Sequence, residues 1–184
     1  MSSLRDQRRS EERAQRRLDR YLVGWADAID GDIARVPLHG SELAAIIDAT
    51  DVDLVSRFKW RYVRGYAQAR PSVKGRTTSL LMHRLLLNPE DGLQVDHIDR
   101  DRLNNRRANL RLATPSQNMG NCGRQVNNTS GYKGVHQQSS GRWSAKLNRK
   151  WLGTFDTAHE AAAAYDAAAL EHFGEFAATN GPRR

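Results

Sequence analysis

The chain has 184 residues, enough for one ordinary domain or two small ones. Its 29 Lys and Arg outnumber 21 Asp and Glu, and the net charge of +8 favours a polyanionic partner over a merely soluble basic protein. The single cysteine, Cys122, excludes an internal disulfide framework and a cysteine-based zinc knuckle, so we expect no zinc.

The distribution of apolar residues predicts where the protein is located in the cell. No apolar run approaches the roughly 20 residues that cross a bilayer, and the chain does not begin with the apolar stretch of a signal peptide. We therefore expect a soluble cytoplasmic protein with no membrane partner. We also expect a monomer or weak dimer.

Residues 1–30 are predicted to form a charged arm, either helical or disordered. The first 20 residues hold seven arginines and four acids with almost no apolar residue. Apolar residues from Leu18 to Trp25 then recur at helical spacing, which predicts a helix to about Ile29. The arginines either touch nucleic-acid phosphates or belong to a solvated helix neutralised by Glu11 and Glu12.

Short strand-like segments dominate residues 33–82. Residues 60–62 and 66–70 alternate around the turn-prone pair Arg64 and Gly65, which predicts a small antiparallel sheet. Residues 49–58 predict a short helix, because Val52, Val55 and Phe58 are spaced three apart. Residues 71–77 read as a loop whose Lys74 and Arg76 either lie along a nucleic-acid groove or form a solvated hairpin end.

The next segment combines a short helix with a strand, a loop and a second helix. Residues 82–87 predict the first helix, and His83 within it would ordinarily be a structural hydrogen-bonding residue. Residues 93–95 predict a strand that ends at Asp96 and His97, and residues 110–112 predict the returning strand. Thr114 followed by Pro115 is typical of a helix start, which places Asn118 one turn into the second helix.

These residue types suit one-metal hydrolysis of a phosphodiester. A carboxylate and an amide oxygen, from Asp96 and Asn118, can bind a hard divalent cation. The imidazole of His97 can take a proton from the attacking water, because the ordinary pKa of histidine lies near neutrality. Asn109 is better placed to hydrogen-bond the backbone and hold the connecting loop, thereby orienting His97.

Residues 33–121 closely resemble the HNH endonucleases of phages and introns. The resemblance implies a ββα-metal fold in which Asp96 and Asn118 bind the metal, His97 is the general base and Asn109 orients it, with His83 as a further member of the catalytic set. It rests on an ordered set of motifs: Met82-His83-Arg84-Leu85, Val95-Asp96-His97-Ile98-Asp99, Asn104-Asn105, Asn109-Leu110-Arg111 and Gln117-Asn118.

Residues 127–181 predict a second unit. Residues 131–135, 141–147 and 151–155 read as three short strands with glycine-bearing turns. Thr157 and Glu160 make a capping box for a helix that reaches about Phe173 and ends at Gly174. We expect Trp143, Phe155 and Tyr165 in its core.

This segment closely resembles the plant APETALA/ethylene-response-factor DNA-binding domain, in which a three-stranded sheet enters the major groove. The most specific matches are the stretch 151–157 and the later Ala-Tyr-Asp-Ala-Ala at 164–168. The plant pattern tends to have Arg at His136 and Gln138 and Trp at Ser140, so the plant target sequence should not be carried over. The resemblance implies a DNA-contacting face that includes His136, Gln138, Arg142, Lys146, Arg149 and Trp151.

The sequence therefore predicts an α+β protein with an arm at 1–30, a nuclease domain at 31–122, a linker at 123–126 and a DNA-binding domain at 127–181. We expect a divalent-metal-dependent endonuclease acting on double-stranded DNA, with magnesium as the metal and manganese as the alternative. A homing-type nickase or double-strand cutter encoded by a phage or another mobile element, acting in a host cytoplasm, fits the resemblance. The alternative is a noncatalytic DNA-binding regulator with a relic nuclease domain.

Overall fold

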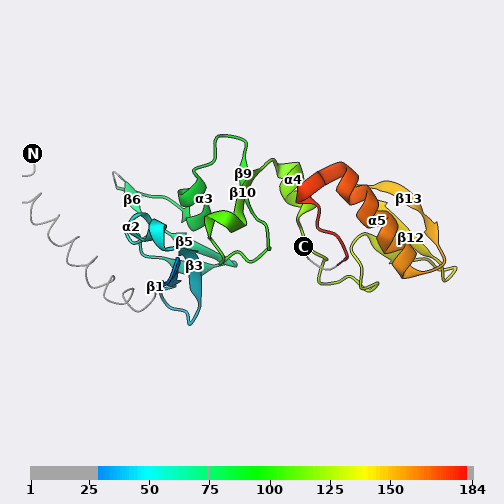
Figure 1. Ribbon diagram of the computed structural model, residues 1–184, viewed down its shortest axis with the longest axis horizontal. Helices are drawn as coiled ribbons and strands as arrows, with labels where there is room; N and C mark the ends of the chain where they lie inside the picture. The colour runs from blue at the N-terminus through cyan, green and yellow to red at the C-terminus, as the bar shows by residue number, and fades with distance from the viewer. Residues whose placement is uncertain (1–28, 74, 182–184) are drawn as a thin grey trace, which may run out of the picture. The chain divides into compact units, whose positions relative to one another are not determined.

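The computed structural model describes residues 29–73 and 75–181, which divide into two compact units (Figure 1). Within the described residues, one unit comprises 29–90 and 101–111, and the other comprises 91–100 and 112–181. Helices and small antiparallel sheets make up both units, which confirms the α+β class. The helix expected up to Ile29 lies outside the described residues, except that Ile29 itself begins strand β1 (Ile29–Asp30).

The first unit contains two three-stranded antiparallel sheets instead of the one small sheet expected. In the first sheet, alternate residues of the two longer strands are buried, including Ala34, Val36, Ala45 and Ile47. The second sheet turns at Arg64 and Gly65, as predicted, and both residues have positive φ. The sheets are β1, β2 (Ile33–Pro37) and β3 (Ala44–Asp48), then β4 (Arg61–Val63), β5 (Tyr66–Ala69) and β8 (Leu80–Leu81).

Short helices and one small hairpin complete this unit. The helical segment expected at 49–58 ends at Val55, where the indole nitrogen of buried Trp60 donates to the Val55 carbonyl. Residues 71–77 were expected to be a loop. Within this range, Ser72 pairs with Thr77 and Val73 with Arg76, so two short strands form a hairpin. The elements are η2 (Ala49–Asp51), α2 (Val52–Val55), β6 (Ser72–Val73), β7 (Arg76–Thr77), α3 (Met82–Leu87) and η3 (Arg107–Asn109).

Two neighbouring arginines fasten the segment 101–111 to the first sheet. Arg107 binds buried Asp51 through two nitrogens, at 2.7 and 3.0 Å, and donates to the Leu86 carbonyl. Arg106 bridges Asp48 and Asp32 at 2.8 and 2.6 Å. Burial alone would raise the pKa of Asp48, but hydrogen bonds from the Arg106 side chain and the Arg107 backbone, with both positive charges, hold it below its ordinary value of 3.8.

The lowered pKa of Asp48 predicts acid sensitivity. A carboxylate whose pKa falls on folding contributes stability that is present above its unfolded-state pKa and lost as the pH falls through its folded-state pKa. We expect the unfolding temperature of the wild type to fall more steeply below about pH 4 than that of Asp48→Asn, because only the wild type must protonate this group. Equal slopes in circular-dichroism melts across that range would contradict the assignment.

The second unit begins with β9 (Gln94–His97) and α4 (Pro115–Gly120). β9 pairs with β10 (Leu110–Ala113), and the division between the units falls within β10. Thr114 and Gln117 form a capping box with Pro115 at the first position of α4, so the predicted helix start is confirmed.

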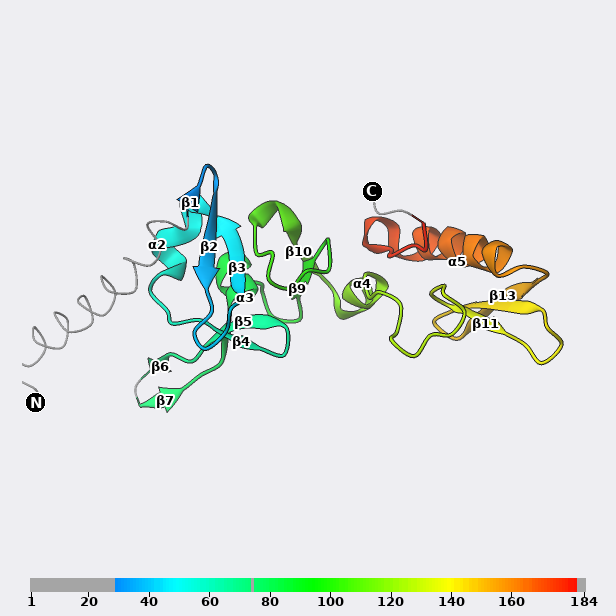
Figure 2. The same cartoon turned by 90° about the horizontal axis from the view of Figure 1, so that it is seen from below.

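A three-stranded antiparallel sheet covered by one helix completes the second unit, and Figure 2 shows the helix lying along one face of the sheet. The predicted capping box of Thr157 and Glu160 starts this helix, which ends at Gly174 with positive φ. The elements are β11 (Val135–Gln137), β12 (Trp143–Leu147), β13 (Lys150–Phe155), α5 (Ala158–Phe173) and η4 (Gly174–Phe176).

Sheet and helix share a close-packed core. Tyr165 is buried, and burial raises its pKa to about 12, with smaller contributions from Asp166 and Cys122. Trp143 and Phe155 pack against the same core, as expected. The turn from β12 to β13 is Asn148 and Arg149, both with positive φ, where a glycine-bearing turn was expected.

The compact units do not follow the predicted domain boundaries at 31–122 and 127–181. Strand β9 and helix α4 cluster with the sheet of β11 to β13 and not with residues 29–90. Compactness and sequence resemblance are different criteria, so the predicted boundaries stay a prediction. Among the described residues, no helix is both long and apolar enough to span a bilayer.

Candidate functional site

Strand β9 carries the Asp96–His97 pair at its end. Both residues are 5% exposed. A turn follows at once, in which the Arg100 N–H donates to the His97 carbonyl at 2.9 Å and Arg100 has φ of 67°. The pair is therefore held on a strand end whose backbone direction is fixed by the turn.

Asn121, which the sequence analysis did not single out, clamps this strand end. It follows α4 directly and is 6% exposed. Its amide nitrogen donates to Asp96 Oδ1 at 2.9 Å and to the carbonyl oxygen of His97 at 2.8 Å. Because a carboxylate and a carbonyl are both acceptors, the nitrogen and not the oxygen of the amide must face them. Its position three residues after Asn118, on the same side of a helical turn, was the available signal.

Asn118 lies one turn earlier, within α4, and contacts the same strand. Its amide nitrogen donates to Oε1 of Gln94 at 2.5 Å. The amide oxygen is the atom that the predicted metal-binding role of Asn118 would use. Gln94 and Asp96 are two residues apart on β9 and therefore share one face of the strand. Two asparagines one helical turn apart therefore bind two residues on the same face of β9. Asn118 binds Gln94, and Asn121 binds Asp96.

The oxygen donors here fit a hard cation held partly by substrate. Among the described residues, no group of three or more His, Cys, Asp and Glu comes together as a metal cage. Magnesium is commonly bound by one or two carboxylates together with waters and substrate phosphates. The carboxylate of Asp96 and the amide oxygen of Asn118 fit that pattern, although whether they bind a metal stays a prediction.

The other two predicted site residues lie in the first unit. His83 is buried in α3, with its ring centroid 5.3 Å from that of Tyr66. Asn109 ends η3, and its amide nitrogen donates to the Asn104 carbonyl at 2.8 Å. Asn109 therefore holds the backbone of its loop, as expected, while its predicted role toward His97 stays a prediction.

Three of the predicted DNA-contacting residues share the sheet face opposite α5. His136 pairs with Ser144 and Lys146 pairs with Trp151 in the sheet register, and alternate residues Val135, Ala145 and Leu147 are buried in the core with α5. His136, Lys146 and Trp151 are exposed, and the Lys146 ammonium lies 5.6 Å from the Trp151 ring centroid.

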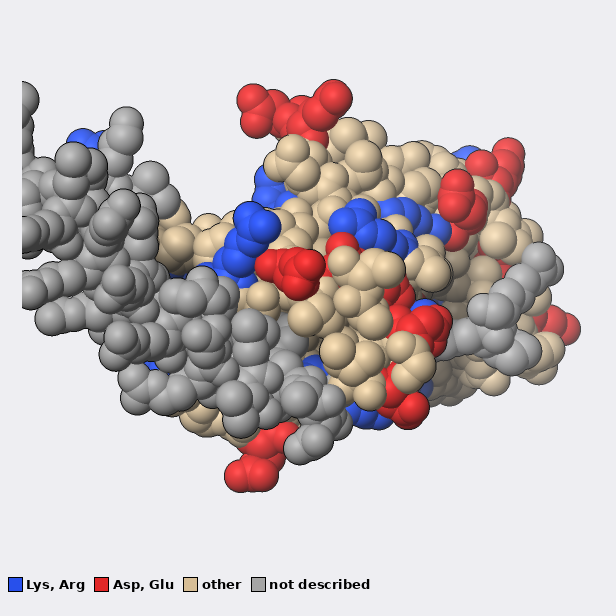
Figure 3. Space-filling model, turned by 60° about the vertical axis from the view of Figure 1, so that its left-hand side comes forward, with Lys and Arg blue, Asp and Glu red and all other residues tan. Residues whose placement is uncertain are grey.

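The remaining predicted contact residues lie in or beside turns of this sheet, or belong to residues 74–76. Arg142 pairs with Asp156 at 3.0 Å, an exposed ion pair of the kind that contributes little to stability. Arg149 is in the β12–β13 turn, and Gln138 follows β11. Arg76 is exposed on β7, whereas Lys74 lies outside the described residues. Basic and acidic side chains are interspersed on the face shown in Figure 3, so charge alone does not single out a binding surface there.

Comparison with known proteins identifies the segment that carries this site. A family model described as HNH endonuclease matches residues 88–120, which include β9, η3, β10 and α4. An uncharacterized HNH endonuclease, L560 of Acanthamoeba polyphaga mimivirus, is 33% identical over 153 residues, covering 77% of this chain and 76% of the viral protein. The chain belongs to the HNH endonuclease family.

Plant transcription factors match a further part of this HNH-family chain. The ethylene-responsive transcription factor ERF084 of Arabidopsis thaliana is 53% identical over 58 residues, and ERN1 of Medicago truncatula is 39% identical over 84 residues. The chain spans only 23% and 31% of their lengths. The similarity is therefore to a domain of those proteins, the one recognised in the sequence. No solved structure matches the chain.

Proposed function

We propose that this chain is a metal-dependent endonuclease that hydrolyses phosphodiester bonds of double-stranded DNA. The observation that supports this best is the buried Asp96 and His97 at the end of β9, within the segment that matches the HNH model. The same strand is hydrogen-bonded by Asn118 of α4, through Gln94, and by Asn121 directly after α4. The ethylene-response-factor-like domain supplies the attachment to DNA.

Asp96 and Asn118 are the residues that would hold the cation, which we propose to be magnesium, with manganese as the alternative. When bound, such a cation neutralises a nonbridging phosphate oxygen and stabilises the leaving 3′ oxygen. Gln94 orients the Asn118 amide so that its oxygen is presented, and Asn121 holds one oxygen of Asp96. The protein's contribution is to fix both oxygens on one strand–helix pair.

His97 takes the proton from the water that attacks phosphorus. Its main chain is held from two sides, by the Arg100 N–H and the Asn121 amide, so the imidazole extends from a fixed point. Asn109 and His83 complete the proposed catalytic set as residues that orient or support the imidazole. A positioned general base of this kind contributes roughly 100-fold to 10,000-fold to the rate.

The exposed sheet face of β11 to β13 is the proposed DNA-binding surface. It presents a cation and an aromatic ring, Lys146 and Trp151, on the side away from α5, with His136 on the same face. Gln138, Arg142 and Arg149 at its turns, and Lys74 and Arg76 of the first unit, are the further proposed contacts. The DNA sequence recognised by this surface differs from the plant target sequence, because His136 and Gln138 stand where the plant domains tend to have arginine, the residue that most commonly contacts guanine.

Lys146→Ala is expected to weaken DNA binding by removing a phosphate contact. The slope of log affinity against log salt should fall by about 0.9, because one fewer counterion is released. Fluorescence anisotropy with labelled duplex DNA across a salt series measures both quantities. Lys150→Ala is the matched control, since Lys150 lies on β13 next to Trp151 and pairs with Leu147 on the core side. An unchanged salt slope for Lys146→Ala would show that Lys146 does not contact DNA phosphates.

The experiment that tests the function is incubation of supercoiled plasmid with the purified full chain, with magnesium, with manganese and with EDTA. Metal-dependent nicking or linearisation is the expected result, and the product distinguishes a nickase from a double-strand cutter. DNA binding without cleavage across several metals and candidate targets would favour the noncatalytic regulator. A homing role on a mobile element, in a host cytoplasm, is part of the proposal, and mapping a single preferred cut site would support it.

A further inference from the structure

The last residue of α4 is held by the C-terminal part of the chain. Two donors reach the carbonyl oxygen of Gly120: the Lys133 ammonium at 2.9 Å and the backbone N–H of Ala178 at 3.1 Å. The last carbonyls of a helix have no partner within the helix, and a positive charge at this end is favourable. All of these residues belong to the second compact unit.

The same residue packs directly on α5. A Cβ built on Gly120 would lie 2.7 Å from Cγ and 2.8 Å from Cδ1 of Phe173, closer than real Cβ atoms approach. Gly120 and Phe173 are both buried. Glycine therefore allows a contact between the end of α4 and the end of α5 that alanine would prevent.

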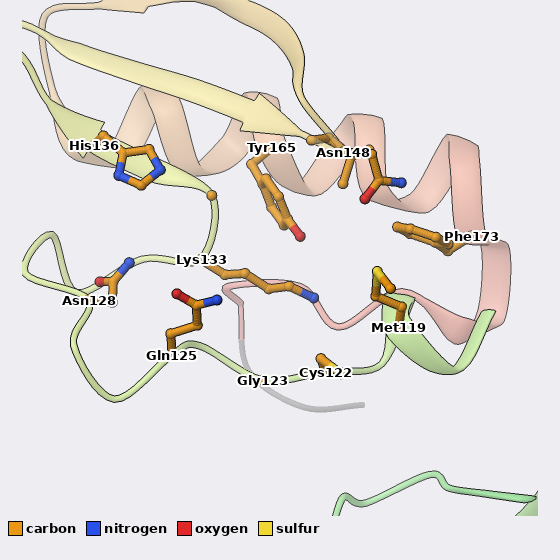
Figure 4. A pocket seen from close by; sticks show the side chains of 12 residues that line it. Met119, Cys122, Gly123, Gln125, Asn128, Lys133, His136, Asn148, Tyr165 and Phe173 are labelled. Carbon is orange, nitrogen blue, oxygen red and sulfur yellow. The ribbon is translucent and has the colours of Figure 1, made fainter. Parts of the chain in front are cut away.

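Both the backbone N–H and the backbone carbonyl of Lys133 are hydrogen-bonded to the side chain of Asn180. Its N–H donates to Asn180 Oδ1 at 2.6 Å, and the Asn180 amide donates to the Lys133 carbonyl at 3.2 Å and to Asp166 on α5 at 2.9 Å. Figure 4 shows the Lys133 side chain extending beside Tyr165 across a cavity of about 300 Å³, toward the end of α4 where Met119 and Cys122 lie. A connected path thus runs from α5 through Asp166, Asn180 and Lys133 to Gly120.

This path ends at the candidate site. Asn118 precedes Gly120 by two residues and binds Gln94, and Asn121 follows Gly120 directly and binds Asp96 and the His97 carbonyl. A shift at Gly120 would therefore move both asparagines relative to β9. The short tether expected at 123–126 would not by itself fix these residues.

We propose that Lys133 and the Gly120–Phe173 contact are positioning elements of the nuclease site, so that the ethylene-response-factor-like domain is part of the catalytic scaffold as well as a targeting module. This inference rests on the proposed function of Asp96, His97 and Asn118. Partners that orient metal-binding residues typically change metal affinity or activity by roughly 10-fold to 100-fold when removed.

The test compares Lys133→Met and Gly120→Ala with the wild type in the full chain. Methionine keeps an apolar stem beside Tyr165 but cannot donate to Gly120, whereas the methyl group added by Gly120→Ala forces α4 away from Phe173 even though alanine favours helix. We expect the magnesium concentration for half-maximal cleavage to rise about tenfold in each variant. DNA affinity in EDTA should stay within twofold of the wild type, which separates positioning from lost binding or unfolding.

Hydrogen exchange supplies a readout that needs no activity. We expect faster amide exchange in residues 115–122 of both variants, with unchanged exchange in β12, and wild-type behaviour for the control Lys150→Met. Wild-type exchange in 115–122 would overturn the proposal, as would a wild-type magnesium midpoint. A wild-type protein that never cleaves DNA would instead overturn the proposed function, and the exchange data would still decide whether Lys133 and Gly120 fix α4.

Discussion

His97→Ala is expected to abolish magnesium-dependent cleavage while leaving DNA binding unchanged. The imidazole is the proposed acceptor of the proton from the attacking water, and removal of such a base costs roughly 100-fold to 10,000-fold in rate. His97 lies at the end of β9, and its carbonyl holds Arg100 and Asn121 through the main chain. Truncating the side chain at Cβ leaves those two main-chain hydrogen bonds in place, so the loss should be chemical.

The measurement is the single-turnover rate on supercoiled plasmid at saturating enzyme, with binding followed separately by anisotropy in EDTA. His159→Ala is the control, because His159 is an exposed histidine at the start of α5. Cleavage at the wild-type rate by His97→Ala would show that His97 is not the general base, and His83 would then be the next residue to test. A parallel loss of DNA binding and of thermal stability would show that His97 is structural.

Local signals in the sequence were enough to predict the elements that carry the site. Thr114 followed by Pro115 predicted the start of α4, and the capping box of Thr157 and Glu160 predicted the start of α5. These features depend on residues within one turn of each other, so they are readable without tertiary context. The position of Asp96 at the end of a strand followed from the apolar residues before it.

What the sequence did not reveal depends on contacts between distant residues. The hydrogen bond from Asn121 to Asp96 joins positions 25 apart, and the bond from Lys133 to Gly120 joins elements that were expected to belong to different domains. The turn between β12 and β13 lies where the predicted strand ends place it, but its left-handed conformation was not predicted, because neither Asn148 nor Arg149 is the glycine that usually marks positive φ. Each of these features is fixed by packing in the folded chain.

Asn121 also explains how a carboxylate and an imidazole can be held at the edge of a two-stranded sheet. One amide nitrogen satisfies two acceptors, the Asp96 carboxylate and the His97 carbonyl, in a buried position. A buried acceptor left without its donor costs about 1–3 kcal/mol. The residue therefore contributes both to local stability and to the placement of the two groups proposed to do the chemistry.

Asn121→Ala is accordingly expected to slow magnesium-dependent cleavage by roughly 10-fold to 100-fold, the usual effect of removing a residue that orients a metal-binding group. The free energy of unfolding should fall by about 1–3 kcal/mol, because the buried Asp96 carboxylate and the buried His97 carbonyl each lose one hydrogen bond, while the Arg100 N–H still donates to the carbonyl. Plasmid cleavage across a magnesium series and urea unfolding measure the two effects on one protein preparation.

Asn127→Ala is the matched control, since Asn127 is an exposed asparagine six residues later. For Asn121→Ala, DNA affinity in EDTA should stay unchanged, because the binding surface lies on β11 to β13. Cleavage at the wild-type rate with the wild-type magnesium midpoint would show that Asp96 and His97 keep their placement without this amide. Reduced stability alone, with normal cleavage, would confine Asn121 to folding and leave Asn118 as the asparagine of α4 that matters to the chemistry.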